Sequence, residues 1–215
     1  MAIAQEKISI VIVDDHELTR LGIRKILEQA NNIEIVGEAD NGDDAISLVR
    51  RLRPKVLLLD IQMPGIPARD IEKWVREEYP EIITLILTGH DRDVYLADFM
   101  KLGVSGYLDK NVVGSNLIAA IYQAVNGEYL FTSEQFKRVH DWSTKVGERW
   151  ESLTTREKEV CNLLTQGLDD HEISNKLRIS QRTVYFHIKN ILKKLKVETR
   201  LQAIAWVNKN ILENL

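Results

Sequence analysis

A single cysteine, Cys161, is present among the 215 residues of the chain. One cysteine excludes a disulfide bond within the chain, as is typical of proteins kept in a reducing compartment. The chain also lacks an apolar run of about 18 residues, which a membrane-spanning helix would require. Its first ten residues, MAIAQEKISI, lack the basic and then apolar pattern of a signal peptide. From these absences we expect a cytoplasmic protein that does not enter a membrane.

An even distribution of charge is lacking too. Residues 1–126 contain 14 Lys and Arg against 20 Asp and Glu, a net charge of −6. Residues 127–215 contain 15 against 12, a net charge of +3. The stretch from Ser180 to Arg200 alone holds six basic residues and one acidic residue, Glu198. This asymmetry predicts two domains, the second of which meets a polyanion.

The first part of the chain alternates between short apolar runs and amphipathic segments. Such alternation predicts a parallel sheet with helices on both faces. We therefore expect an α/β fold of the flavodoxin-like (βα)5 type, a doubly wound sheet with strand order 2-1-3-4-5. The expected strands are 8–13, 33–39, 56–59, 82–87 and 106–108, and the expected helices are 17–29, 43–52, 68–78, 92–102 and 113–126.

Polar residues follow four of these strands where each strand ends. They are Asp14 and Asp15, then Asp60, then Thr88, and finally Asp109 and Lys110. Because parallel strands end at one edge of the sheet, and strands 1 and 3 flank the point where strand order reverses, we expect Asp14 and Asp15 beside Asp60. Carboxylates crowded in this way need a cation, and oxygen ligands without His or Cys select a hard ion such as Mg²⁺.

A carboxylate flanked by Mg²⁺, a lysine and a hydroxyl is suited to accept a phosphoryl group, because both cations neutralise charge on the transferring group. This makes Asp60 the candidate phosphoacceptor. Each residue also has an ordinary alternative: an Asp after a strand is usually a turn or N-cap residue, and a lone Lys is usually solvated. The joint occurrence of all four positions at one edge favours the site.

The pattern weakens after Gly127, and we expect an α/β domain at 7–127, a linker at 128–151 and a helical domain at 152–215. The last region has no strand signal. It contains a helix that Asp169 or Asp170 caps, a tight connection at Arg178 and Ile179, and a basic helix that begins after Ser180. Two helices joined in this way form a helix-turn-helix.

The apolar stripe of the basic helix leaves a set of polar, basic and aromatic residues away from the core. Lys and Arg neutralise phosphates, whereas Gln, Tyr and Lys reach base edges. The alternative is a helical bundle with a solvated basic face. The candidate DNA-binding residues are Gln181, Arg182, Thr183, Tyr185, Phe186, Lys189, Lys193 and Lys194.

Four motifs, VDDHELTRLGI, LLLDIQMPG, LILTGHD and GVSGYLDK, resemble the receiver domain of bacterial two-component response regulators over about residues 7–127. The resemblance implies that a sensor histidine kinase phosphorylates Asp60. It implies that Asp14, Asp15, Asp60 and the backbone carbonyl of Gln62 hold Mg²⁺. It further implies that Thr88 and Lys110 bind the phosphoryl group and that the rotamer of Tyr107 follows a shift of Thr88.

The segments LTTREKEVCNLLTQG and HEISNKLRISQRTVYFHIKNILKKLKVETRLQAI resemble the LuxR-type helix-turn-helix over about residues 152–206. A receiver followed by this module is the architecture of the NarL/FixJ response regulators, which implies DNA as a partner and a homodimer after phosphorylation. The apolar stripe of the last helix, up to Leu215, is a candidate dimer surface or ordinary packing. Tyr185 replaces a common Lys, and Asp169, Asp170 and His171 replace Ser-Asn-Lys. The two carboxylates place negative charge near the expected DNA backbone.

Two other functions remain open from the sequence. A strand-borne Asp with Mg²⁺, Thr and Lys also occurs in phosphatases that form an aspartyl phosphate, but these carry an acid two residues later, where this chain has Gln62. We therefore do not expect an enzyme. The departures in the helix-turn-helix leave the third possibility, a receiver that controls protein partners without binding DNA.

Overall fold

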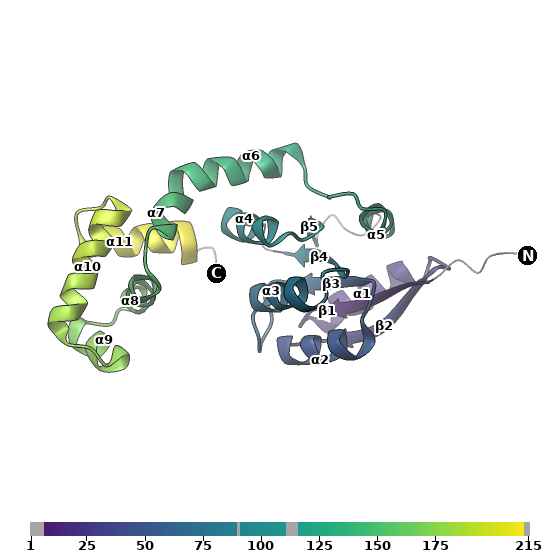
Figure 1. The fold of residues 1–215 in the computed structure, drawn as a ribbon, viewed down its shortest axis with the longest axis horizontal. Helices are drawn as coiled ribbons and strands as arrows, with labels where there is room; N and C mark the ends of the chain where they lie inside the picture. Colours follow the sequence, from purple (N-terminus) through teal and green to yellow (C-terminus); the bar gives the residue numbers. More distant parts are fainter. Residues whose placement is uncertain (1–6, 90, 111–115, 213–215) are drawn as a thin grey trace, which may run out of the picture. The chain divides into compact units, whose positions relative to one another are not determined.

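The computed structural model describes residues 7–89, 91–110 and 116–212, and within these ranges the chain forms two compact units (Figure 1). The first unit runs up to Asp91 and continues over Tyr95–Phe136. The second unit comprises Arg92–Val94 and the described chain from Lys137 onward. None of the described helices is long and apolar enough to cross a membrane.

The first unit is built on a parallel sheet with the order β2-β1-β3-β4-β5, which confirms the predicted fold. All five residues of the central strand β3 are buried, as a strand covered on both faces requires. The fourth strand begins and ends one residue later than predicted, and it therefore includes Thr88. The strands are β1 (Ile8–Val13), β2 (Ile33–Ala39), β3 (Val56–Asp60), β4 (Ile83–Thr88) and β5 (Gly106–Asp109).

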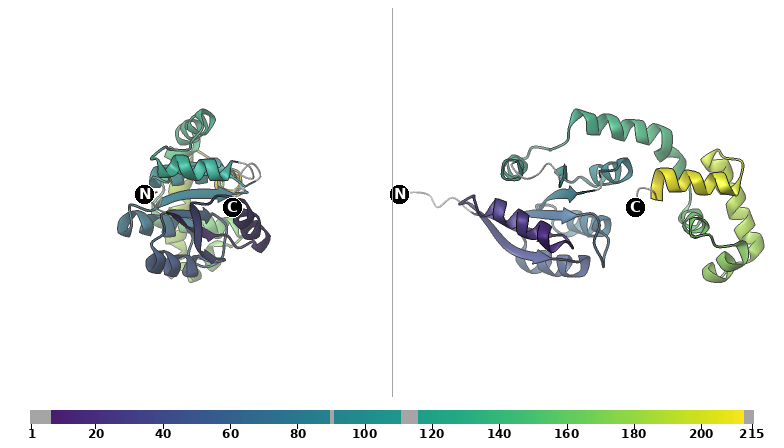
Figure 2. Two further views of the ribbon diagram at one scale, coloured as in Figure 1. Left: turned by 90° about the vertical axis from the view of Figure 1, so that its right-hand side faces the viewer. Right: turned by 180° about the vertical axis from the view of Figure 1, so that it is seen from behind.

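Helices cover both faces of this sheet. One core cluster joins alternate residues of β1 and β3, such as Ile10 and Leu58, to Ile23 of α1 and Ile121 of α5. Helix α1 lies in front in the right-hand view of Figure 2, whereas α2 and α3 face the viewer in Figure 1. The helices are α1 (Glu17–Leu27), α2 (Gly42–Leu52), α3 (Ala68–Glu78), α4 (Asp93–Leu102) and α5 (Leu117–Val125). Residues 113–115 of the last predicted helix lie outside the described residues.

The connection between the two predicted domains is mostly helical. Gly147 lies in a π-helical turn within the predicted linker, and a Cβ at this position would come within 2.9 Å of the Trp142 ring. Glycine is therefore required for a close approach and does not interrupt the helix. The elements are α6 (Ser133–Trp142), η1 (Ser143–Gly147) and α7 (Glu148–Glu151).

The rest of the second unit is a small helical bundle whose helix starts follow the expected capping chemistry. Asp169 caps one helix with a reciprocal box to Glu172, and Ser180 accepts a hydrogen bond from the backbone N–H of Thr183. Cys161 is buried in the core, and burial raises the pKa of its thiol to about 12. The elements are α8 (Thr155–Thr165), α9 (Asp170–Leu177), α10 (Gln181–Leu195), α11 (Arg200–Val207) and η2 (Asn208–Leu212).

The apolar residues of the last helix, a candidate dimer surface or ordinary packing, have two different environments. Leu201 is 77% exposed. The inward face is formed instead by Ala203, Val207 and Ile211, which recur every four residues and are all buried. Leu215 lies outside the described residues.

Candidate functional site

The ends of β1, β3, β4 and β5 meet at one edge of the sheet. Val13 is registered beside Leu59, so the next residues, Asp14 and Asp60, are neighbours. Thr88 is paired in register with Asp109, directly before Lys110. Asp14, Asp60 and Thr88 are 1%, 4% and 0% exposed. The sheet thus gathers the predicted strand-end residues into one largely buried pocket.

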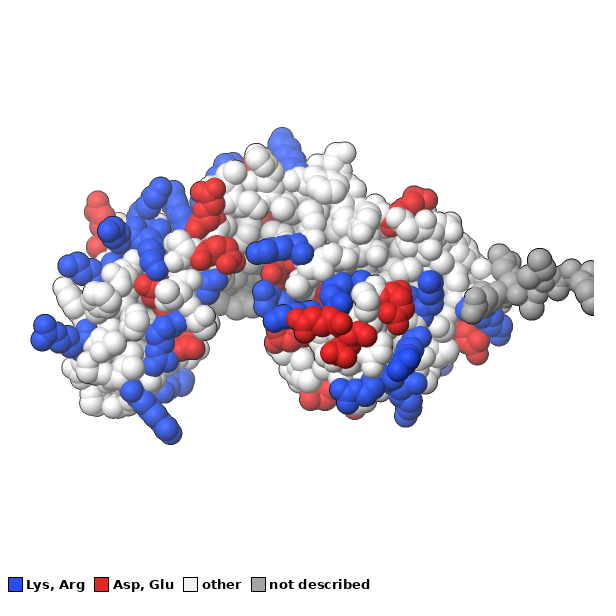
Figure 3. Space-filling model, in the orientation of Figure 1, with Lys and Arg blue, Asp and Glu red and all other residues white. Residues whose placement is uncertain are grey.

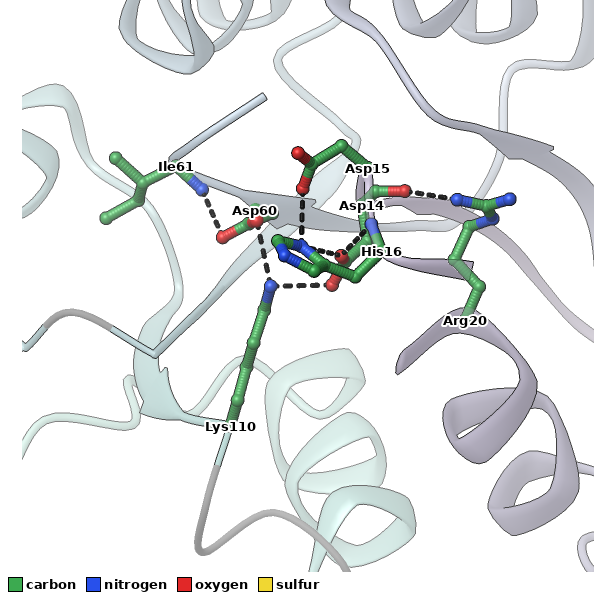
Figure 4. A network of polar contacts seen from close by, with 7 residues as sticks. All are labelled: Asp14, Asp15, His16, Arg20, Asp60, Ile61 and Lys110. Carbon is green, nitrogen blue, oxygen red and sulfur yellow. Dashed lines mark hydrogen bonds and ion pairs between the residues drawn. The ribbon is translucent and has the colours of Figure 1, made fainter. Parts of the chain in front are cut away.

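Lys110 lies between the two buried carboxylates (Figure 4). Its Nζ is 2.7 Å from Asp14 Oδ2 and 2.8 Å from Asp60 Oδ2. The other oxygen of Asp60 accepts a hydrogen bond of 2.7 Å from the backbone N–H of Ile61. The single ammonium group therefore holds two carboxylates together at the point where β1 and β3 end.

The positive charge of Lys110 does not fully offset the burial of the carboxylates in the pocket. Burial raises the pKa of Asp60 above its usual range, and the charge of Asp14 raises it further, although Lys110 and the Ile61 N–H pull it down. Burial lowers the pKa of Lys110, but the hydrogen bonds to Asp14 and Asp60 outweigh that effect and raise it. The carboxylates therefore favour additional positive charge.

Two residues that the sequence did not single out complete the acidic edge. His16 Nδ1 lies 2.7 Å from Asp15 Oδ1, and its backbone N–H donates to Asp14 Oδ1 over 2.9 Å. Arg20 donates to the backbone oxygen of Asp14 over 2.6 Å. A histidine directly after an Asp-Asp pair was the available sequence signal, but we had excluded His from the ligand set.

The acidic edge fits a metal ion. Asp14, Asp15, His16 and Asp60 each offer a ligand atom, and these atoms lie within 4.8 Å of one another. Three of the four are carboxylates, the donors that hard divalent cations prefer. Gln62, whose backbone carbonyl we predicted as a further ligand, is partly buried two residues past the end of β3.

The two predicted switch residues lie behind this pocket. Thr88 is buried at the end of β4, and its backbone oxygen accepts a hydrogen bond of 2.9 Å from the N–H of Lys110. Tyr107 is 2% exposed on β5, paired in register with Ile86. Its backbone oxygen accepts a hydrogen bond of 3.0 Å from Gln135 at the start of α6. Thr88 therefore lies on the strand next to that of Asp60, and Tyr107 lies one strand further, three residues before Lys110.

The basic helix α10 presents most of its predicted DNA-binding residues to solvent. Blue Lys and Arg side chains outnumber red Asp and Glu side chains on the visible face of the helical unit in Figure 3. Thr183 is partly buried, and its Oγ1 lies 2.8 Å from Ser180 Oγ. The exposed members are Gln181, Arg182, Tyr185, Phe186, Lys189 and Lys193.

Lys194 has a different environment from its neighbour Lys193. Its Nζ lies 2.6 Å from Glu157 Oε2, and Glu157 is 3% exposed. The same Glu157 oxygen accepts the backbone N–H of Thr154 in a capping box. Lys194 therefore joins α10 to the start of α8.

Asp169 and Asp170, the two carboxylates that we expected to repel the DNA backbone, both have partners within the protein. Asp169 Oδ1 accepts the backbone N–H of Glu172 over 2.8 Å as the cap of α9. Asp170 Oδ1 lies 2.6 Å from Arg200 Nη1 in α11. The Arg200 partner compensates the charge of Asp170, which reduces the expected repulsion.

Comparison with known proteins gives matches over both units. Residues 10–122 match the response regulator receiver domain, and residues 151–207 match the luxR family of bacterial regulatory proteins. The chain is 34% identical over 211 residues to the nitrate/nitrite response regulator NarL of Escherichia coli K12, covering 95% of this chain and 96% of NarL. It is 33% identical over 224 residues to the transcriptional regulatory protein DegU of Brevibacillus brevis, covering 96% and 95%.

A solved structure is similar over nearly the whole chain. It is RcsB from Salmonella enterica serovar Typhimurium, bound to a promoter in the presence of the phosphomimetic BeF3⁻. The TM-score is 0.65 at 25% sequence identity, and the match covers 94% of this chain and 98% of RcsB.

Proposed function

The chain belongs to the DNA-binding response regulators of two-component systems, with a receiver domain and a LuxR-type domain, and on this premise we propose that Asp60 is its phosphoacceptor. The observation that supports this assignment most is the position of Lys110 between Asp14 and Asp60, at 2.7 and 2.8 Å. Asp60 is the carboxylate that both joins this contact and ends the central strand β3.

The proposed reaction transfers a phosphoryl group from a histidine of a sensor kinase. An oxygen of Asp60 forms the new bond to phosphorus while the phosphorus–nitrogen bond breaks, and the kinase imidazole leaves with the electron pair and takes up a proton. Lys110 exchanges its contact with the Asp60 carboxylate for one with a phosphoryl oxygen, and the Thr88 hydroxyl donates to another. Asp14, Asp15, Asp60 and the backbone carbonyl of Gln62 would hold Mg²⁺, which would neutralise charge on the transferring group.

We propose that residues 7–127 form a receiver domain with two conformational states. The segment 128–151 connects this domain to a DNA-binding domain at 152–215. Phosphorylation shifts the equilibrium between the two receiver states through Thr88 and Tyr107. The helix α10 then enters the major groove, with Tyr185, Phe186 and Lys189 at base edges and Arg182, Thr183 and Lys193 nearer the backbone. The compensation of Asp170 by Arg200 supports DNA over a protein partner.

Dimerisation on paired half-sites is part of this proposal, because structures of two RcsB dimers on DNA exist among the similar proteins. We place the protein in the cytoplasm, where its kinase and DNA are accessible. We propose no multiple-turnover hydrolysis, since Gln62 stands where an aspartyl-phosphate enzyme carries its second acid.

Incubation with a small phosphodonor and Mg²⁺ tests the assignment. Intact-mass spectrometry should show one added phosphoryl group on the wild-type protein and none on Asp60→Asn. The matched control is Asp109→Asn, which changes another strand-end aspartate and should leave phosphorylation intact. An Asp60→Asn protein that gains a phosphoryl group at the wild-type level would refute the phosphoacceptor assignment.

A further inference from the structure

In the helix-turn-helix, a histidine of the first helix contacts the start of the second helix. His171 is the second residue of α9, and Gln181 is the first residue of α10. Gln181 Nε2 lies 2.9 Å from His171 Nδ1. On the other side of the ring, His171 Nε2 lies 3.2 Å from Asn175 Nδ2, four residues along α9. The imidazole is thus held between two side-chain amides, ten and four residues away.

The number of protons on the ring restricts these two contacts. A neutral imidazole carries one N–H and one bare nitrogen, and an amide nitrogen can only donate. Only one of the two amides can therefore donate to the ring. The other amide must turn its oxygen toward the ring N–H. The tautomer of His171 and the orientations of Asn175 and Gln181 are consequently fixed together.

Two arrangements meet these conditions, and one of them keeps the amide nitrogen of Gln181 against the ring, as the structure places it. The shorter contact, 2.9 Å, joins Gln181 Nε2 to His171 Nδ1, and 2.9 Å is an ordinary length for a hydrogen bond from nitrogen. In this arrangement Gln181 donates to Nδ1, and the ring proton on Nε2 is donated to the oxygen of Asn175. Gln181 then keeps its carbonyl oxygen and its second amide hydrogen, which lie side by side.

The backbone at this point is fixed independently. Ser180 accepts the backbone N–H of Thr183 over 3.1 Å, and its hydroxyl lies 2.8 Å from that of Thr183. The start of α10 is therefore capped, and Gln181 is exposed at its first position. What remains adjustable is the direction of the Gln181 amide, which His171 controls.

We infer that His171 is a positioning residue that orients the Gln181 amide to read adenine. An oxygen beside an N–H is the pattern that a Gln offers to the N6 and N7 atoms of adenine in the major groove. The reversed amide would exchange the positions of the oxygen and the N–H and would mismatch the N6 and N7 atoms of adenine. This inference rests on the proposed binding of DNA by α10.

Selection of bound DNA from a random pool by the full-length, phosphorylated protein tests the inference. The wild-type protein should prefer adenine at one position of each half-site. Gln181→Ala should lower that preference about tenfold, and His171→Ala should lower it about fivefold at the same position. The double variant should lose no more than Gln181→Ala alone, because the two residues act through one contact. The control His140→Ala, an exposed histidine of α6, should change nothing.

Rescue distinguishes positioning from simple packing. His171→Gln can accept the Gln181 N–H through its own amide oxygen, so it should retain most of the adenine preference. Nitrogen chemical shifts of the His171 ring should show the proton on Nε2 in the wild-type protein. A proton on Nδ1 would overturn the inference.

The role of His171 and the binding of DNA by α10 would be overturned by different results. Sequence-specific binding that His171→Ala leaves unchanged, or weakens equally at every position, would overturn the role of His171 and leave the DNA function intact. A wild-type protein that selects no sequence at all would overturn both.

Discussion

Two lysines, one in each unit of the chain, form short ion pairs with buried carboxylates, yet their surroundings differ. Lys110 contacts Asp14 and Asp60 at 2.7 and 2.8 Å, where strands end. Lys194 contacts Glu157 at 2.6 Å, between two helices. Burial raises the pKa of Asp60 above its usual range, and Lys110 does not offset this effect.

The carboxylate of Glu157 shows the opposite balance. Burial alone would raise its pKa, but hydrogen bonds from Lys194 and from Thr154 outweigh burial, and the pKa is lowered. Contacts within the protein thus stabilise the charged form of Glu157, whereas the contacts of Asp60 do not offset the effect of burial. We conclude that the pair in the helical unit is structural, and that the receiver pocket retains a demand for positive charge that a ligand can meet.

The largest expected effect comes from removing Lys110 in a phosphorylation assay, with removal of Lys194 as the control. Lys110→Ala removes a cation from the transferring group and should slow phosphorylation of Asp60 about 100-fold. Lys194→Ala should leave the rate unchanged. The check is the initial rate of phosphoryl incorporation from a small phosphodonor in Mg²⁺. Equal rates for Lys110→Ala and the wild-type protein would remove the distinction between the two lysines.

A fourth buried carboxylate, Glu72, extends the comparison to the dependence of stability on pH. Glu72 is 0% exposed on α3, and burial raises its pKa from 4.5 to about 7 even though Arg76 Nε lies 2.9 Å away. The folded state therefore holds the proton more tightly than the unfolded state. Stability is fully present below about pH 4.5 and falls by about 3 kcal/mol as the pH rises to about 7.

Denaturant titrations at several pH values measure this dependence. Glu72→Gln should remove most of the decrease, since its side chain does not titrate. Glu78→Gln, an exposed residue of the same helix, should retain the wild-type slope. An unchanged slope in Glu72→Gln would assign the decrease to other groups.

A smaller effect separates Lys194 from Lys193 on DNA. Lys193 is exposed, so Lys193→Ala should weaken binding by a few-fold and reduce the salt slope of the affinity by about 1. Lys194→Ala should leave that slope unchanged, because Glu157 already neutralises Lys194. Titration of DNA at several salt concentrations supplies both numbers. A reduced slope for Lys194→Ala would restore it to the DNA-binding set, as the sequence predicted.

The sequence was sufficient for the sheet and for the pocket, because both depend on local patterns. An apolar run followed by Asp60 indicates a buried strand and its end, and the parallel topology then brings Asp14, Thr88 and Lys110 to the same edge. No contact between distant side chains had to be known. The same holds for the helix starts at Asp169 and Ser180, where capping is decided within three residues.

The parts that the sequence did not show depend on contacts across elements. Helical periodicity could not reveal that Lys194 pairs with Glu157, 37 residues away on α8. Such pairings follow from tertiary packing and not from local pattern. His16 is a different case, because it directly follows Asp15 and was overlooked only because the expected metal ligands were oxygen atoms.

The most direct test of the difference between the two pockets replaces each carboxylate by its neutral amide in the full-length protein. Amide hydrogen exchange can follow β1 and β3 separately from α8 and α10. Asp60→Asn should raise the free energy of unfolding of the receiver unit near pH 7, because it removes a charge that burial disfavours. Glu157→Gln should lower that of the helical unit by about 2 kcal/mol, because it leaves Lys194 without its partner. We predict that the free energy of unfolding changes in opposite directions in the two units. A decrease in both units would contradict the difference between the Asp60 and Glu157 sites.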